Sequence, residues 1–251
     1  MNPICFHVGS RPVYWYGVMM ALAFLAGIGH WQVLGRRTGR RDAAFSSDLA
    51  FWLMVGGIVG ARCAYVLANF SYFSAAPMEI IRVDQGGLIF YGGFIGAVLA
   101  FILFARSRRE RILQLADFAI TALPLGHALG RVGCFLNGCC QGRVVEVPSL
   151  LSAHLHRYPV QLYEAAFNLV VYAVLTTVYL HRRGQHHGQV LATYLMLYPA
   201  GRFMLEFLRG DERLRWGLFS AAQYLSLALM ALGLGLWIVL QRHHENDHRT
   251  A

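Results

Sequence analysis

Three arginines lie inside long apolar stretches of the chain: Arg62, Arg131 and Arg202. A charge at bilayer depth costs at least about 2.5–3.5 kcal/mol, so an intramembrane arginine usually faces the protein interior and serves a function. Guanidinium groups bind phosphate through several planar donors and a permanent charge. The three arginines therefore predict a phosphate site, and at that depth the phosphate most naturally belongs to a phospholipid headgroup.

Tyrosines and a carboxylate accompany the arginines. Tyr198, Arg202 and Glu206 are four residues apart, so they share one face of a helix. In a purely structural interpretation, Arg202 and Glu206 neutralise each other. Tyr16 and Tyr91 begin two apolar stretches, where tyrosines often serve only as interfacial anchors. A functional site is favoured because a structural need gives no reason for three arginines to cluster in the same half of the bilayer.

Glycine-rich segments flank these polar residues and include Gly92, Gly93, Gly133 and Gly142. Glycine has no side chain, so a lipid headgroup can reach backbone N–H groups at such positions. Close packing of helices through small residues is the alternative. Both interpretations fit Gly92 and Gly93, whereas the position of Gly133 beside Arg131 favours the site.

Cys134, Cys139 and Cys140 lie within seven residues. Packing, a disulfide, a catalytic or substrate-binding role and a metal site are all open for them. The spacing C-x4-C-C is not a standard zinc pattern, although His154 and His156 follow in the next loop. We therefore assign no metal to the chain, and we expect no cofactor.

The composition indicates a membrane protein. The 251 residues are 57% hydrophobic and only 14% charged, whereas soluble domains are about 25% charged. Disordered chains are excluded by the same figures, and a small disulfide scaffold is excluded because the 251 residues include only five cysteines. Seven stretches are long and apolar enough to cross a bilayer: 13–34, 48–70, 87–105, 115–136, 160–180, 189–208 and 218–240.

The basic residues predict the orientation of these spans. The net charge is +9, and all 22 basic residues are arginines, mostly in clusters between apolar stretches. Such clusters are typical of orientation signals rather than of a nucleic-acid-binding face, so we expect no nucleic acid partner. The side with more arginines carries the C-terminus. We thus expect an all-α membrane protein, a single domain of residues 1–251 with seven transmembrane helices, the N-terminus outside and the C-terminus in the cytoplasm.

Over nearly its whole length, the chain resembles the prolipoprotein diacylglyceryl transferase family of bacteria. The segments that carry the resemblance are VYWYGVM, GGIVGARCAYVL, GGLIFYGGFIG, GRVGCFLNGCCQG, YPVQLYEA and YPAGRFMLEFLRGD. Typical members read GRxGNFxNxExxG, where this chain has Cys134 in place of the first Asn and Cys139 in place of the Glu. Typical members also have a histidine, a proposed base, where this chain has Tyr91.

The resemblance implies an enzyme of the bacterial cytoplasmic membrane. It implies transfer of a diacylglyceryl group from phosphatidylglycerol to the cysteine thiol of a prolipoprotein signal peptide, with release of glycerol phosphate. We expect Tyr91 to accept the thiol proton, with Glu206 and then His127 as alternatives. The expected catalytic residues are Arg131, Arg202, Tyr91, Glu206 and Tyr16, and the expected substrate-binding residues are Arg62, Gly92, Gly93, Gly133, Cys134, Asn137, Cys139, Gly142 and Tyr198.

Three other functions stay open at this point. A related phospholipid-dependent transferase with a different acceptor would use the same arginines. A transporter or lipid-binding membrane protein usually shows internal repeats, and none is evident. A thiol-redox protein rests on the cysteine cluster alone, and the usual C-x-x-C motif is absent.

Overall fold

The computed structural model describes residues 3–39, 41–83, 86–145, 157–181, 187–211 and 215–250; for 215–216 and 243–250 it describes the backbone alone. His154 and His156 lie outside this part of the chain. Two compact units divide the chain: residues 1–31 and 116–251 form the first unit, and residues 32–115 form the second.

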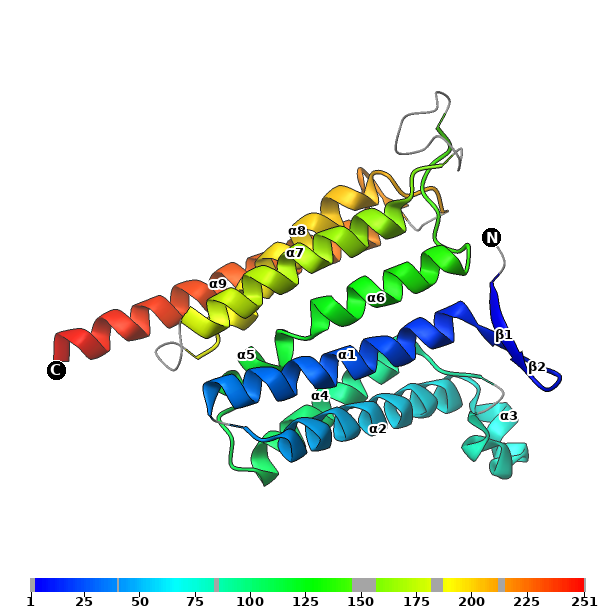
Figure 1. Cartoon of the computed structure of the whole chain (residues 1–251), viewed down its shortest axis with the longest axis horizontal. Helices are drawn as coiled ribbons and strands as arrows, with labels where there is room; N and C mark the ends of the chain where they lie inside the picture. The colour runs from blue at the N-terminus through cyan, green and yellow to red at the C-terminus, as the bar shows by residue number, and fades with distance from the viewer. Residues whose placement is uncertain are drawn as a thin grey trace. The chain divides into compact units, whose positions relative to one another are not determined.

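The second unit is a pair of long helices with a short helical connection. Its elements are α2 (Ala43–Ala68), α3 (Phe70–Ala75), the 3₁₀ helix η1 (Pro77–Ile81) and α4 (Phe90–Ser107). The Asp42 carboxylate caps α2 by accepting the Phe45 N–H at 2.7 Å. Helices α2 and α4 pack side by side (Figure 1).

Glycines let α2 and α4 approach closely. A Cβ atom on Gly60 would lie 2.4 Å from the Gly92 oxygen, and one on Gly96 would lie 2.2 Å from the Gly56 oxygen. These distances leave no room for a side chain, so the two backbones are in direct contact. Gly93 also faces α2, since its Cβ would lie 3.2 Å from the oxygen of Gly57. Both glycines of the predicted pair thus pack against α2, and substrate binding by them stays a prediction.

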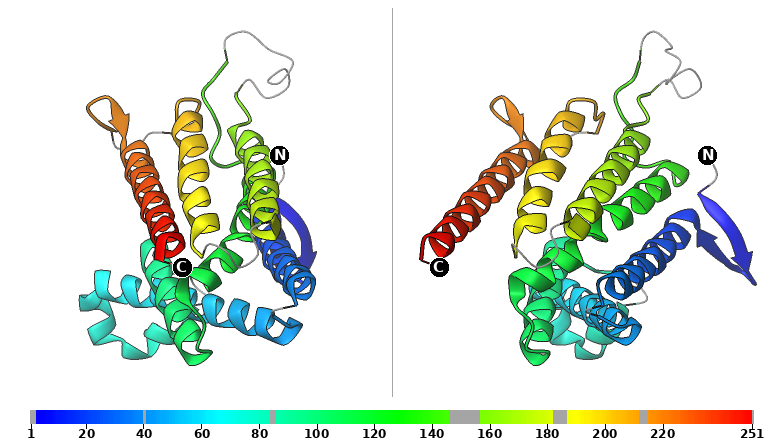
Figure 2. Two further views of the ribbon diagram at one scale, coloured as in Figure 1. Left: turned by 90° about the vertical axis from the view of Figure 1, so that its left-hand side faces the viewer. Right: turned by 60° about the vertical axis from the view of Figure 1, so that its left-hand side comes forward.

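The first unit holds a larger helical layer. Its elements are β1 (Ile4–Val8), β2 (Arg11–Tyr14), most of α1 (Trp15–Thr38), the end of α5 (Ile112–Ile120), α6 (Leu123–Leu136), α7 (Val160–His181), α8 (Gln189–Glu206), β3 (Arg215–Trp216), β4 (Phe219–Ser220) and α9 (Ala221–Thr250). Helix α6 packs on α7, α7 packs on α8, and α8 packs on α9. Figure 2 shows α7, α8 and α9 side by side.

A buried carboxylate fixes the start of α8. Asp117 accepts the N–H of Gly188 at 2.6 Å and the N–H of Leu191 at 2.8 Å. The first N–H groups of a helix have no partner within the helix, and Asp117 supplies one. The position of α8, and therefore of Arg202 on it, is thus tied to α5.

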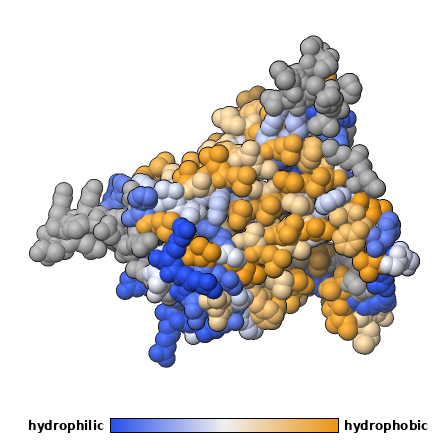
Figure 3. Space-filling model, viewed as in Figure 1, coloured by the Kyte–Doolittle hydropathy of each residue, from blue (hydrophilic) through white to orange (hydrophobic). Residues whose placement is uncertain are grey.

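Six helical segments of the described residues are long and apolar enough to cross a membrane: Trp15–Thr38, Ala43–Ala68, Phe90–Ser107, Ile112–Leu136, Val160–His181 and Ala221–Arg242. Many large apolar side chains are exposed along these helices (Figure 3), as expected where lipid surrounds them. The seventh predicted span forms α8, but polar residues such as Arg202 and Glu206 lower its hydropathy, and α8 is not among the six.

Two details differ from the expected all-α fold. The chain is mostly helical, but β1 pairs with β2 and β3 pairs with β4 as short antiparallel hairpins. These segments lie before or at the beginning of apolar stretches, where backbone polar groups need partners of their own. The stretch 115–136, expected as one span, is broken at residues 121–122, and α6 begins with Pro124 in its first turn, a position where proline removes no helical hydrogen bond.

Candidate functional site

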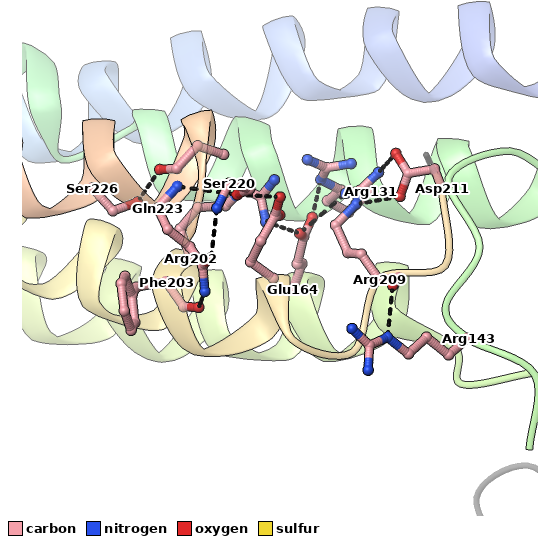
Figure 4. A network of polar contacts seen from close by, with 12 residues as sticks. Arg131, Arg143, Glu164, Arg202, Phe203, Arg209, Asp211, Ser220, Gln223 and Ser226 are labelled. Atoms are coloured by element: carbon pink, nitrogen blue, oxygen red, sulfur yellow. Dashed lines mark hydrogen bonds and ion pairs between the residues drawn. The ribbon is translucent and has the colours of Figure 1, made fainter. Parts of the chain in front are cut away.

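One buried carboxylate pairs with three arginines in the first unit. Glu164 on α7 is 3% exposed, and its Oε2 forms an ion pair with Nε of Arg131 on α6. Its Oε1 lies 3.5 Å from Nη1 of Arg202 on α8 and 3.5 Å from Nη1 of Arg209. Figure 4 shows the four side chains converging from different segments. Glu164 by itself compensates only one of these three positive charges.

A second carboxylate holds Arg202 from its own helix. Glu206 Oε2 lies 2.6 Å from Arg202 Nη1, which is the pair that the structural interpretation of the four-residue spacing predicts. The hydroxyl of Ser220 donates to the other oxygen of Glu206 at 2.8 Å. Gln223 in turn accepts the N–H of Ser220 at 2.9 Å. Because both of its oxygens already have partners, Glu206 is suited to orient Arg202 rather than to accept a proton.

Arg209 joins this cluster from the segment after α8. Its Nε and Nη2 donate to the two oxygens of Asp211 at 2.9 and 3.1 Å, the bidentate geometry favoured by guanidinium groups. Burial lowers the pKa of Arg209, but the hydrogen bonds to Asp211 and the charge of Glu164 outweigh it and raise the pKa. Arg209 therefore stays charged and permanently compensates part of the negative charge of Glu164 and Asp211.

Arg131 keeps donors for a further partner. Its side chain is 25% exposed, against 13% for Arg202 and 3% for Arg209. Within the described part of the chain, Glu164 is the one carboxylate paired with Arg131, and the pair uses Nε. The two terminal nitrogens of Arg131 are thus oriented but not consumed by that pair. A phosphate oxygen could accept hydrogen bonds from them.

Other predicted residues of the first unit lie on the same helices. A Cβ on Gly133 would be 2.9 Å from Met19 Cβ and 3.5 Å from Tyr16 Cδ2, so α1 packs on α6 at this glycine. The imidazole of His127 lies 5.2 Å from the ring of Tyr198, measured between centroids. Nδ1 of His127 is buried and has no hydrogen-bond partner among the described residues, so it is available to a bound polar group.

Four predicted site residues belong to the second unit. Arg62 is buried there and donates to four backbone carbonyls, those of Glu79, Ile80, Gly86 and Gly87, at 2.6–3.1 Å. Its guanidinium thus holds the loop before α4 in place. The other three residues lie at the start of α4: Tyr91, Gly92 and Gly93. Tyr91 is 71% exposed, and a role in the reaction for these four residues stays a prediction.

Three cysteines form a cluster at the C-terminal end of α6. Sγ atoms of Cys134, Cys139 and Cys140 all lie within 4.8 Å of one another, and all three cysteines are free thiols. Burial raises the pKa of Cys139. Burial also raises the pKa of Cys140, but hydrogen bonds with Cys139 and Arg209 and nearby positive charge outweigh it and lower the pKa. The cluster is therefore connected to the arginines through Arg209.

Gly142 joins this segment to α7 and to the end of α8. It forms an isolated bridge with Arg209, and its N–H donates to the Tyr158 oxygen at 3.1 Å. A Cβ on Gly142 would lie 2.5 Å from that same oxygen. The contact is too close for any side chain, so glycine is required for packing whether or not it also admits substrate.

We therefore expect Gly142→Ala to lower stability by about 1–3 kcal/mol, the usual cost of overpacking, and to lower activity by displacing Arg209. Thermal unfolding of the purified protein in detergent measures the first effect. Gly126→Ala is the matched control, because a Cβ there meets nothing within 4 Å. Equal stability of the two variants would contradict the packing role of Gly142.

The family model for prolipoprotein diacylglyceryl transferase matches residues 3–239. The chain is 36% identical to a phosphatidylglycerol–prolipoprotein diacylglyceryl transferase of Pseudoalteromonas translucida, covering 95% of this chain and 92% of the relative. It is 35% identical to the protein of that name from Geobacter sulfurreducens, covering 96% of each, and 33% identical to the one from Lactiplantibacillus plantarum, covering 99% and 92%.

This chain belongs to the prolipoprotein diacylglyceryl transferase family. The resemblance seen in the sequence segments is thereby confirmed. Together with its six candidate spans, family membership makes the chain a multi-pass transferase of the bacterial cytoplasmic membrane.

Two residues of the ion-pair cluster around Glu164 were not among the site residues predicted from the sequence. Glu164 lies near the start of the stretch 160–180 and Arg209 directly after the stretch 189–208, and neither position alone indicates a role. A carboxylate at the depth of Arg131 is itself a signal, because an intramembrane charge usually has a partner. The signal does not say which arginine that partner is, since Arg131 and Glu164 are 33 positions apart on different helices.

Proposed function

We propose that this chain transfers the diacylglyceryl group of phosphatidylglycerol to the cysteine thiol of a prolipoprotein signal peptide, the first step of bacterial lipoprotein maturation. In this reaction the sulfur attacks the glycerol carbon that bears the phosphate ester. A carbon–sulfur bond forms, the carbon–oxygen bond breaks, and glycerol phosphate leaves with the electron pair. The proposal is supported most directly by the convergence of Arg131 and Arg202 on Glu164.

In the proposed mechanism, Arg131 and Arg202 bind the phosphate and stabilise the charge that develops on it as it leaves. Preorganised donors in a water-poor site are effective at this task because they need no reorganisation during the reaction. Glu164 and Glu206 orient the two guanidinium groups. Tyr16, Gly133, Asn137, Gly142 and Tyr198 are proposed to shape the surrounding site, on the basis of the family motifs.

The thiol proton needs an acceptor, because the thiolate is the nucleophile. Tyr91 remains the proposed acceptor on the basis of its place in the family motif. Within the first unit, the geometry favours His127 over Glu206, since Nδ1 of His127 has no partner among the described residues while both oxygens of Glu206 are engaged.

We further propose that the chain is a single transferase domain with seven spans, α8 being the seventh. The N-terminus would lie outside and the C-terminus in the cytoplasm, as the arginine distribution predicts. An odd number of spans follows from these positions. Accessibility of single cysteines introduced near each terminus to a membrane-impermeant reagent in intact cells tests this topology.

A second candidate function is supported by three departures from the family pattern, at Tyr91, Cys134 and Cys139. A divergent site could take another acceptor while using the same phospholipid. Incubation of the purified protein with phosphatidylglycerol and a signal peptide that carries the acceptor cysteine distinguishes the two. We expect a peptide mass increase equal to one diacylglyceryl group. Consumption of phosphatidylglycerol without modified peptide would favour a different acceptor.

A further inference from the structure

The end of α6 folds into a turn that directs cysteines toward one another. Gly138 has φ +73°, its N–H donates to the Phe135 oxygen, and the N–H of Cys139 donates to the Cys134 oxygen at 3.1 Å. These two hydrogen bonds define a Schellman motif. In this motif, the side chain three positions before the C-cap residue contacts the side chain two positions after it. In this chain those two side chains are Cys134 and Cys139.

Cys140 adds a third thiol at a conformational cost. Its φ is +60°, in the left-handed region that residues other than glycine and asparagine rarely adopt. All three Sγ atoms then lie within 4.8 Å of one another. The usual apolar contact of a Schellman motif needs two side chains, so packing alone does not account for the third. The proposed transfer reaction uses the thiol of the substrate and assigns no chemical step to these three thiols, and substrate binding by Cys134 and Cys139 stays a prediction.

We propose that Cys134, Cys139 and Cys140 form a binding site for a soft monovalent cation, of which copper(I) is the natural example, held by three thiolate sulfurs. Thiolates select such ions over the hard cations that prefer oxygen. A metal–sulfur bond of about 2.3 Å in a trigonal plane places the sulfurs about 4 Å apart, in accord with the observed limit of 4.8 Å.

The ligand number and the surrounding charge decide between soft ions. Structural zinc sites almost always have four protein ligands, and zinc sites with three protein ligands add a water as the fourth, whereas a soft monovalent ion can be held by the three sulfurs of the candidate group found among the described residues. Three thiolates and one monovalent ion carry two negative charges, which positive groups nearby would stabilise. Arg209 forms a hydrogen bond with the Cys140 side chain, and the charge of Arg131 acts on the same thiol. Each thiol releases its proton to solvent as it binds.

The test uses the full-length protein in detergent, reduced and without oxygen, titrated with copper(I) against a chromophoric copper(I) chelator. We expect one ion per chain and an X-ray absorption spectrum with three sulfur neighbours. Cys134→Ser, Cys139→Ser and Cys140→Ser should each weaken binding at least 100-fold. The double variant Cys5→Ser with Cys63→Ser is the matched control and should bind as the wild type does, since these are the two remaining cysteines.

Three results would overturn the proposal. The first is absence of binding by the wild type or by the control variant, both of which retain the cluster. The second is a spectrum with two sulfurs, or tighter binding of zinc with four ligands. The third is a disulfide among the three cysteines in protein isolated from membranes with its thiols blocked, which would make the cluster a redox pair. Spectra of wild type and control do not depend on whether the serine variants fold.

Discussion

Replacing Arg131 with alanine should lower the rate of diacylglyceryl transfer about 100- to 1,000-fold, the usual effect of removing one preorganised donor to a developing negative charge. The reason is geometric: Glu164 holds Nε of Arg131, and the terminal nitrogens remain for the phosphate. Arg202→Ala should have an effect of the same order. Initial rates of peptide modification by the purified variants measure both.

Two controls make the arginine result specific. Arg131→Lys keeps the charge but loses the planar set of donors, so it should restore only a small part of the rate. Arg11→Ala removes an exposed arginine of β2 and should leave the rate unchanged. Because Arg131 and Arg202 act on one phosphate, the double variant should lose less than the product of the two single effects. Rates within tenfold of the wild type for Arg131→Ala would contradict its role.

Replacing Glu164 with glutamine should damage both stability and catalysis. Glu164 is the shared carboxylate of three guanidinium groups and is 3% exposed. Removing one partner of a buried ion pair costs on the order of 3–5 kcal/mol, because the remaining charges lose their compensation. The turnover rate should fall as well, since Arg131 is no longer oriented, whereas KM for phosphatidylglycerol should not rise, because positive charge is retained.

The contrast with Arg131→Ala makes the Glu164 result informative. Loss of Arg131 should raise KM and lower kcat together, because a phosphate ligand is gone. Loss of the Glu164 charge should lower kcat and the thermal midpoint without raising KM. Glu79→Gln is a suitable control, since Glu79 pairs with Arg82 at the surface of the other unit, and exposed pairs contribute little. An unchanged thermal midpoint in Glu164→Gln would show that the carboxylate is not needed to compensate the arginines.

Much of the fold was predictable because the bilayer imposes length and composition on each span. The stretches at 48–70 and 160–180 became α2 and α7 with small shifts at their ends. Contacts within one helix were predictable too, since the spacing of Arg202 and Glu206 indicates their ion pair. The hairpins before α1 and before α9 were missed, because hydropathy says little about short segments outside the membrane.

Contacts between helices could not be predicted from the sequence. Arg131 was identified from its depth, but nothing in the spacing showed that Glu164 of another helix holds it. Gly92 illustrates the same limit, since glycine fits either a lipid headgroup or a neighbouring helix, and the structure shows packing on Gly60. For Cys134 and Cys139, sequence proximity was visible, but the turn that brings their sulfurs together depends on the left-handed backbone of Gly138.

Binding of glycerol phosphate, the leaving group, by the purified protein is the most direct measure of whether Arg131 and Arg202 share one phosphate. Calorimetric titration in detergent should give a dissociation constant that rises at least tenfold in Arg131→Ala and in Arg202→Ala, and remains unchanged in Arg11→Ala. Glycerol phosphate bound equally well by the wild type and by both site variants would contradict the assignment of these guanidinium groups to the phosphate.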